Sequence, residues 1–394
     1  MTGPSAPLRE GEVRLSAPGK LMLAGEYAVL APGRAALVAA VDRHLRLSVR
    51  PSADATVELW HRPSFVALVG ELTGEINRPV RWIGDVPEEL RFAARATELG
   101  LRLCAEEGRV LAGFYATFEN DFELFAPSDV VTEPPTPHAK PGLGGSAAAS
   151  VLAVRAACLA QQRPLSPAET LALASASHWI EQGGSGSGAD VAAAALGGAL
   201  EVRMLRARLP PDELWALPAR AILAEPLIEA HPLPLPEDLR LVAVWTGESS
   251  DTRVLVRAVR EFGAVNAALF EACVTRISAC VESLRTALGA AARDSSSDDA
   301  RESALDAVRE AAAAMAALGE EAQAPIITPA LVVIAALASA VGCAAKPSGA
   351  GGGDCAVLFA FGDAAQSRAL QLLRTRELQA VSLSIAPHTP ELLS

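Results

Sequence analysis

The chain has 394 residues, of which 51% are hydrophobic and 4% aromatic, and its formal net charge is −12. This length exceeds what one hydrophobic core usually organises, so we expect two domains. The negative charge argues against nucleic acid as a partner, because that needs a basic face, and no apolar run is long enough to cross a membrane.

Alternating apolar residues indicate strands in the first part of the chain, and apolar residues three to four positions apart indicate one helix. In order, we expect strand over residues 14–30 with a tight turn at Pro18-Gly19, strand from the Pro32-Gly33 turn to Val41, a helix over 87–107, and a strand over 113–124. This part is therefore predicted to open with β-structure.

The middle of the chain alternates glycine-rich loops with alanine-rich helices. Helices are predicted over 146–161, over 167–181 and directly after Asp190, and loops over 141–145 and 183–188. A proline-rich stretch over 210–236 indicates the crossing into a second domain, so we expect domains at 1–210 and 211–394. In the second domain we expect strands over 239–245, 356–360 and 381–385, and helices over 254–288, 300–318, 331–341 and 363–374.

The six cysteines are widely spaced, with neither a CxxC pair nor histidines at zinc-ligand spacing. The N-terminal residues lack the apolar stretch of a secretory signal. We therefore expect reduced, mostly buried thiols and a cytoplasmic location.

Only three lysines occur among the 34 basic residues, at Lys20, Lys140 and Lys346, and each adjoins a glycine-rich segment. A compact ammonium group suits close approach to phosphate oxygens. We therefore expect the three lysines to converge around a phosphate-bearing ligand.

Residues 140–150, KPGLGGSAAAS, combine glycines with the start of a helix. Glycines permit positive φ and close backbone approach, and a helix N-terminus offers unpaired N–H groups to an anion. The pattern is neither a Walker loop nor a dinucleotide fingerprint. The Ser146 hydroxyl could cap the helix or bind magnesium, and the sequence leaves both open.

Three ordered segments resemble the motifs of the GHMP small-molecule kinase family: SAPGKLMLAGEYAVL at 16–30, KPGLGGSAAAS at 140–150, and KPSGAGGGDC at 346–355. Segments 39–45, 186–198 and 245–252 are similar to the phosphomevalonate kinases of that family. The resemblance implies an α+β fold, with an N-terminal α/β domain, a ferredoxin-like C-terminal domain, and the active site in the cleft between them. It implies an enzyme that uses ATP and Mg²⁺ to convert (R)-5-phosphomevalonate to 5-diphosphomevalonate, on the mevalonate route to isopentenyl diphosphate.

The resemblance also assigns roles to individual residues. The catalytic pair would be Lys20 and Asp190, and Ser146 would bind the metal. The nucleotide would be bound by Lys140, Gly142, Leu143, Gly144, Gly145, Ser146 and Ala147. The acceptor would be bound by Lys20, Ser187, Gly188, Asp190, Ser348, Gly349, Ala350, Gly351 and Gly352.

The chain departs from the family pattern at several positions. Gly145 stands where a serine is usual, and His178 and Glu181 lie where many members carry a magnesium-binding glutamate. Asp251 replaces a serine, and its carboxylate would repel a substrate phosphate unless it is turned away or paired with Arg253.

Three acidic residues near the motifs have two readings each. Glu26 and Asp42 could orient Lys20 or a substrate-binding arginine, although a cap or ion pair is the commoner role. Asp354 could contact the nucleotide or be a structural residue of its loop, and the structural role is preferred. The alternatives to the expected function are mevalonate kinase, another GHMP small-molecule kinase, or a non-catalytic ligand sensor of the same fold. The expected partners are small molecules only, and the expected state is a monomer or homodimer.

Overall fold

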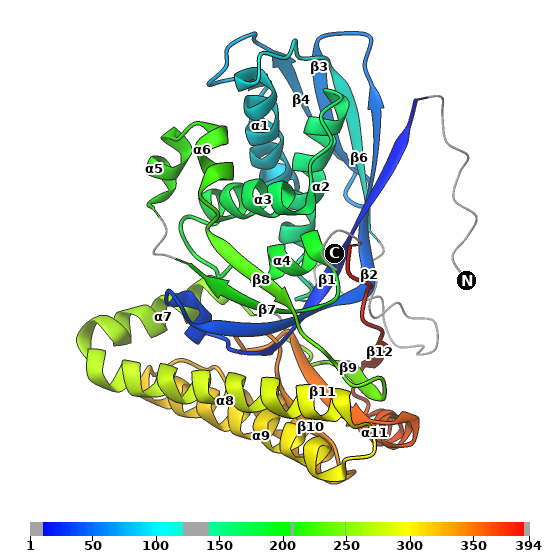
Figure 1. Cartoon of the computed structure of the whole chain (residues 1–394), viewed down its shortest axis with the longest axis vertical. Helices are drawn as coiled ribbons and strands as arrows, with labels where there is room; N and C mark the ends of the chain where they lie inside the picture. Colours follow the sequence, from blue (N-terminus) through cyan, green and yellow to red (C-terminus); the bar gives the residue numbers. More distant parts are fainter. Residues whose placement is uncertain (1–10, 121–141, 206–208, 249, 390–394) are drawn as a thin grey trace.

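The computed structural model describes residues 11–120, 142–205, 209–248 and 250–389. Its elements form two packed parts, which Figure 1 shows one above the other: a large sheet with helices on one face, and a smaller sheet beside two long helices. The α+β architecture predicted from the sequence is confirmed.

Within the described residues, the first part contains an eight-stranded sheet in the order β5-β4-β3-β6-β2-β7-β8, with β1 paired to β2. Its strands are β1 Val13–Ala24, β2 Ala35–Pro51, β3 Thr56–His61, β4 Val66–Leu72, β5 Val80–Trp82, β6 Phe114–Asn120, β7 Ala199–Met204 and β8 Ile228–Pro232. β3 and β6 pair in parallel, and the other neighbours pair antiparallel.

Helices cover one face of this sheet (Figure 1). They are η2 Glu88–Leu90, α1 Arg91–Glu106, α2 Gly145–Ala160, α3 Pro167–Glu181 and α4 Ala189–Leu196. The short helices α5 Pro211–Ala216 and α6 Ala219–Ala224 pack against α1 and α3, and η1 Ala28–Leu30 follows β1. Small residues allow α1 and α2 to approach closely, since a Cβ on Gly100 would lie 3.0 Å from that of Ala157. A capping box of Ser166 and Glu169 fixes the start of α3.

The second part contains a four-stranded antiparallel sheet in the order β10-β11-β9-β12. Its elements are β9 Leu239–Trp245, α7 Thr252–Val265, α8 Ala267–Arg293, α9 Asp298–Glu321, α10 Pro329–Ser339, β10 Ala344–Pro347, β11 Cys355–Phe361, α11 Asp363–Arg374 and β12 Ala380–Leu383. Alternate residues of β9 face opposite layers: Leu241 packs with α8 and α9, whereas Val242 packs with α10 and α11.

One continuous core joins the two parts. Leu21 and Leu23 of β1 pack in the same buried cluster as Phe359 of β11 and Leu284 of α8. The chain beyond β12 returns to the first sheet, where the Ala386 N–H donates to the Ala40 carbonyl at 3.0 Å. The two parts are therefore joined by shared buried contacts and by backbone hydrogen bonds.

Several sequence-based boundaries differ from the structure. The expected turn at Pro18-Gly19 is a register shift inside one continuous strand, and the expected helix over 254–288 is two helices that meet at Asn266. Strands β3, β4, β5, β7 and β8 were not predicted.

The expected domain boundary at residue 210 also falls too early for the observed packing. β8 pairs with β7, and α5 and α6 pack on the core of the first part. The crossing to the second part therefore follows Pro232, near the end of the proline-rich stretch.

Candidate active site

Lys20 lies on β1, two residues after the register shift begins at Pro18. Its backbone N–H donates to the Leu143 carbonyl, and its Nζ donates to the Gly142 carbonyl, both at 2.9 Å. The side chain is half-buried. Lys20 therefore holds the loop that precedes α2, and its ammonium group lies beside that loop.

The loop before α2 has the geometry of an anion site. Gly142 and Gly144 have φ of 68° and 82°, which favour glycine. Gly144 is the N-cap of α2, and no side chain in the described residues caps it, so the first amides of the helix are free for a ligand. Leu143 is buried in the core that joins the two parts and anchors the loop.

Lys20 and Asp190 lie close together at Gly144. A Cβ on Gly144 would lie 3.2 Å from Cγ of Lys20 and 3.5 Å from Cβ of Asp190. Asp190 is in the first turn of α4, after Gly188 with φ of 81°, and its Oδ1 accepts from the Val191 N–H at 2.9 Å. The structure thus brings together the two residues predicted to be catalytic, from segments 170 residues apart.

Ser146 and Asp190 are linked through His178. The Ser146 Oγ lies 3.1 Å from His178 Nε2, and Asp190 Oδ2 lies 4.0 Å from the same nitrogen. The imidazole is buried and stacks on Phe92 with ring centroids 4.9 Å apart. A hydroxyl and a carboxylate, both hard oxygen donors, therefore face one small region at the N-terminus of α2.

Glu181 has a different role from the magnesium-binding glutamate of many family members. Its carboxylate pairs with Arg91 at 3.3 Å and with Arg95 at 3.4 Å. Both arginines lie on α1, so Glu181 joins α1 to the end of α3.

The second glycine loop, residues 348–353, connects β10 to β11 and reaches Lys20 from the other part. A Cβ on Gly349 would lie 3.8 Å from Lys20 Nζ. The Met22 N–H donates to Ser348 Oγ at 2.9 Å, and the Tyr27 hydroxyl donates to the Ala350 carbonyl at 2.5 Å. Burial and the neighbouring Glu26 carboxylate raise the pKa of Tyr27, which keeps this donor protonated.

Close packing explains the next two glycines of this loop. A Cβ on Gly351 would lie 2.3 Å from the Ile326 carbonyl oxygen, and one on Gly352 would lie 2.8 Å from a methyl carbon of Leu255. The backbone of the loop therefore lies against the start of α7 and the segment before α10. Sequence reasoning predicted contact with substrate here, and the packing places at least Gly351 and Gly352 at structurally restricted positions.

Asp354 connects the second glycine loop to two other segments. Its N–H donates to the Glu248 carbonyl at 2.7 Å, and its Oδ1 accepts from the Ser250 N–H at 3.2 Å. A Cβ on Gly142 would lie 3.0 Å from Asp354 Cβ. Burial raises the pKa of Asp354, against the opposing effects of the Ser250 amide and Lys20. Apart from the position of Asp354 after three glycines, no pattern along the chain indicated these contacts.

The expected convergence of three lysines is only partly correct. Lys346 is buried and its Nζ donates to the Glu26 carboxylate and to the Pro347 carbonyl, so its ammonium group has protein partners. Lys140 lies outside the described residues. Of the two lysines that are described, Lys20 is the one beside the loop of α2.

The remaining polar residues singled out from the sequence have local partners. Ser187 Oγ accepts from the Ala189 N–H at 3.2 Å, and Asp42 accepts from the Ser384 N–H at 3.1 Å. Asp251 caps α7 by accepting from the Arg253 N–H at 2.9 Å. That amide is the main cause of the lowered pKa of Asp251, and the Arg253 side chain adds to it. The repulsive charge expected at this position is therefore paired.

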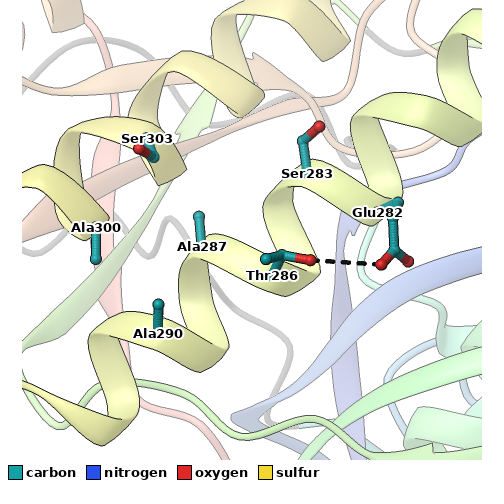
Figure 2. Close-up of a pocket in the computed structure, with 7 residues that line it drawn as sticks. All are labelled: Glu282, Ser283, Thr286, Ala287, Ala290, Ala300 and Ser303. Atoms are coloured by element: carbon teal, nitrogen blue, oxygen red, sulfur yellow. Dashed lines mark hydrogen bonds between the residues drawn. The ribbon is translucent and has the colours of Figure 1, made fainter.

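A surface hollow of about 380 Å³ lies between α8 and α9 (Figure 2). In the sequence, its lining residues are distant from the two glycine loops. Alanine, serine and threonine side chains line it, together with Glu282, which accepts from the Thr286 hydroxyl at 3.4 Å. These lining residues include no basic side chain, so the hollow does not suit a phosphate-bearing ligand.

The described residues contain no cluster of three histidine, cysteine or acidic side chains that could hold a metal. They also include no helix of the length and apolarity needed to cross a membrane. None of the six cysteines, all of which lie in the described residues, forms a disulfide, and all but the half-buried Cys273 are buried.

Comparison with known proteins gives matches over nearly the whole chain. The models of the GHMP kinases N terminal domain and the GHMP kinases C terminal domain match residues 104–198 and 297–376. A phosphomevalonate kinase from Streptomyces sp. (strain CL190) is 32% identical over 391 residues, which cover 95% of this chain and 96% of the relative.

Two solved structures have the same fold. The Lin0012 protein from Listeria innocua has a TM-score of 0.80 at 24% identity, covering 96% of this chain and 99% of its own. The Streptococcus pneumoniae phosphomevalonate kinase in complex with phosphomevalonate and AMPPNP has a TM-score of 0.73 at 19% identity, covering 95% and 99%. On the sequence identity to the Streptomyces enzyme and the two domain matches, the chain belongs to the GHMP kinase family, in the group of the phosphomevalonate kinases.

Proposed function

We propose that this enzyme transfers the γ-phosphoryl group of ATP to the phosphate of (R)-5-phosphomevalonate and so forms 5-diphosphomevalonate. The observation that carries the proposal is the placement of Lys20 and Asp190 against Gly144, at the N-terminus of α2. The name of the Streptomyces relative supports the choice of acceptor.

The loop and first turn of α2 would hold the nucleotide phosphates. The amides of Gly145, Ser146 and Ala147 lie at the positive end of the helix dipole, where negative charge is stabilised. Gly145 lacks the hydroxyl usual in the family, but its backbone N–H still belongs to this set. Lys140 is proposed to contact the phosphates from the segment before the loop.

Ser146 would hold Mg²⁺ together with the ATP phosphates. Magnesium commonly takes one or two protein oxygen ligands and completes its shell with phosphate and water, so the absence of a larger cluster in the described residues does not conflict with this site. The bound ion would neutralise charge on the phosphate oxygens during transfer.

The acceptor needs little help from a base. A phosphate monoester has a second pKa of about 6, so its attacking oxygen is already mostly deprotonated at neutral pH. Lys20 would stabilise the charge that spreads over the transferred group, and Asp190 would orient Lys20 and the acceptor in line. Ser187, Gly188 and residues 348–352 are proposed to contact the acceptor. Six mostly buried cysteines without a disulfide among them support a reducing, cytoplasmic location.

A coupled assay of ADP release tests the proposal, with phosphomevalonate, mevalonate and galactose offered separately at saturating ATP and Mg²⁺. We expect kcat/KM to be highest for phosphomevalonate. Preference for mevalonate would overturn the choice of acceptor, and no turnover with any of the three would reject this reaction.

A further inference from the structure

A buried ion pair joins the two parts of the molecule next to the proposed active site. Glu26 follows β1 in the first part, and Lys346 lies on β10 in the second. Their side chains are 3% and 0% exposed, and the Lys346 ammonium donates directly to Glu26 Oε1. The pair therefore lies across the boundary between the parts, excluded from solvent.

Such a pair is a poor source of stability. Removing two charges from water costs several kcal/mol per ion, and apolar replacements of similar volume are often neutral or stabilising. Burial lowers the pKa of Lys346, while Glu26 opposes that shift and the neighbouring Lys20 adds to it. The geometry that the pair imposes is a better explanation for its presence than the energy it contributes.

The contacts around the pair connect the Lys20 strand to the second glycine loop. Glu26 Oε1 also accepts from the Gly349 N–H at 3.4 Å, and the Met22 N–H donates to Ser348 Oγ at 2.9 Å. Lys346 also donates to the Pro347 carbonyl. Met22 and Glu26, which follow Lys20 in the first part, thus hold Ser348 and Gly349 at the start of the loop in the second part.

We propose that Glu26 and Lys346 are positioning residues that set the place of the 348–353 loop relative to Lys20. The proposal rests on the phosphoryl transfer proposed above. The two described lysines then have separate roles, because Glu26 neutralises Lys346 whereas Lys20 faces the phosphates. A Cβ on Gly349 would lie only 3.8 Å from Lys20 Nζ, so a small movement of the loop changes the surroundings of the reacting group.

The test replaces both charges at once, in the variant Glu26→Gln/Lys346→Met of the full chain. A single replacement would leave the other charge buried and unpaired and would lower the melting temperature, so the double variant is the informative one. We expect its melting temperature to stay within a few degrees of the wild type. We expect kcat to fall about tenfold to a hundredfold, with KM for ATP changed less than about threefold, because misplacement of catalytic groups lowers the rate of transfer.

Arg102 and Glu106 on α1 supply a matched control. This pair is also buried, with side chains 4% and 7% exposed and 3.7 Å apart, and it also contacts neighbouring backbone, since Arg102 donates to the Trp215 carbonyl at 2.8 Å. It lies among α1, α5 and α6, outside the loops of the proposed site. The variant Arg102→Met/Glu106→Gln should change stability and leave kcat unchanged at temperatures where it is folded.

Hydrogen–deuterium exchange of the residues 346–355 gives a readout that does not depend on turnover. We expect faster exchange there in the Glu26→Gln/Lys346→Met variant, with α9 unchanged. A folded double variant with wild-type kcat, or with wild-type exchange in this segment, would overturn the proposal. If the wild type itself does not phosphorylate phosphomevalonate, the proposed function fails, and the exchange result alone decides whether the pair positions the loop.

Discussion

Gly144→Ala separates the chemistry of the site from its stability. Gly144 has φ of 82°, and an added methyl group would lie 3.2 Å from Lys20 Cγ and 3.5 Å from Asp190 Cβ. Alanine is the smallest change that introduces both backbone strain and this contact. The two consequences can be measured independently, as thermal stability and as turnover.

The cost in stability follows from the backbone. A residue with a Cβ in the left-handed region costs about 1–2 kcal/mol relative to glycine. The contact with Lys20 is tighter than an ordinary van der Waals contact, so the lysine stem must move by a few tenths of an ångström. A displacement of about 1 Å can cost about a hundredfold in rate, so a smaller one should lower kcat about tenfold, which corresponds to about 1.4 kcal/mol.

Gly84→Ala is the control for the backbone strain. Gly84 has φ of 80°, and an added Cβ would have no other described atom within 4 Å. It follows β5 at the edge of the first sheet. We therefore expect Gly84→Ala to lower the free energy of unfolding by a similar amount and to leave kcat unchanged.

Thermal unfolding and the coupled ADP assay measure the two effects on both variants. We expect kcat to fall more for Gly144→Ala than for Gly84→Ala when the two variants are compared at equal folded fraction. Wild-type kcat in a folded Gly144→Ala protein would refute it, since Lys20 and Asp190 would then tolerate displacement or lie away from the reacting groups.

Three further predictions concern charge and hydrogen bonding. Asp190→Asn should lower kcat about a hundredfold and leave nucleotide affinity nearly unchanged. Single-turnover kinetics and ATP titration measure the two effects, and unchanged turnover would remove Asp190 from the site. Asp354→Ala should raise KM for phosphomevalonate about threefold to tenfold, because the Ser250 amide loses its hydrogen-bond partner. Asp354→Asn should have a smaller effect. Equal effects of the two variants would assign the role to the charge of Asp354. Glu169 has its pKa lowered to about 2, chiefly by Arg163, so its stabilisation is present at neutral pH and is lost as pH falls from about 4.5 towards 2. Glu169→Gln should therefore flatten the dependence of unfolding free energy on pH in that range, and an unchanged slope would contradict the assigned cause.

The sequence predicted the elements that have strong periodicity or clear caps. The helices over 167–181 and 363–374 match α3 and α11 at both ends, because a capping serine and proline begin the first and a glycine precedes the second. Strands β3, β4 and β5 were not predicted, since they lie in short segments whose pairing partners are set by the sheet. The break at Asn266 was also not predicted, because apolar residues continue across it.

The site was predictable where the residue types themselves limit the backbone. Glycines at 142, 144 and 349 have positive φ, and the motifs indicate Lys20 and Asp190 as candidates from the sequence alone. The partners of His178 and Asp354 could not be predicted, because each contact joins segments that only the folded chain brings together. The spacing of residues along the sequence does not indicate such contacts unless the residues belong to a known motif.

The two described lysines suit their positions for two different physical reasons. At Lys20 a narrow ammonium group is required because the stem passes Gly144 and the Nζ reaches the Gly142 carbonyl. At Lys346 the side chain is fully buried, and a planar guanidinium with five donors would need more space and more acceptors than Glu26 and Pro347 provide. Both positions exclude arginine, but one excludes it beside the proposed phosphate site and the other inside the protein. A rare residue type in a composition therefore marks steric and electrostatic restriction, and contact with ligand has to be argued separately from the folded structure.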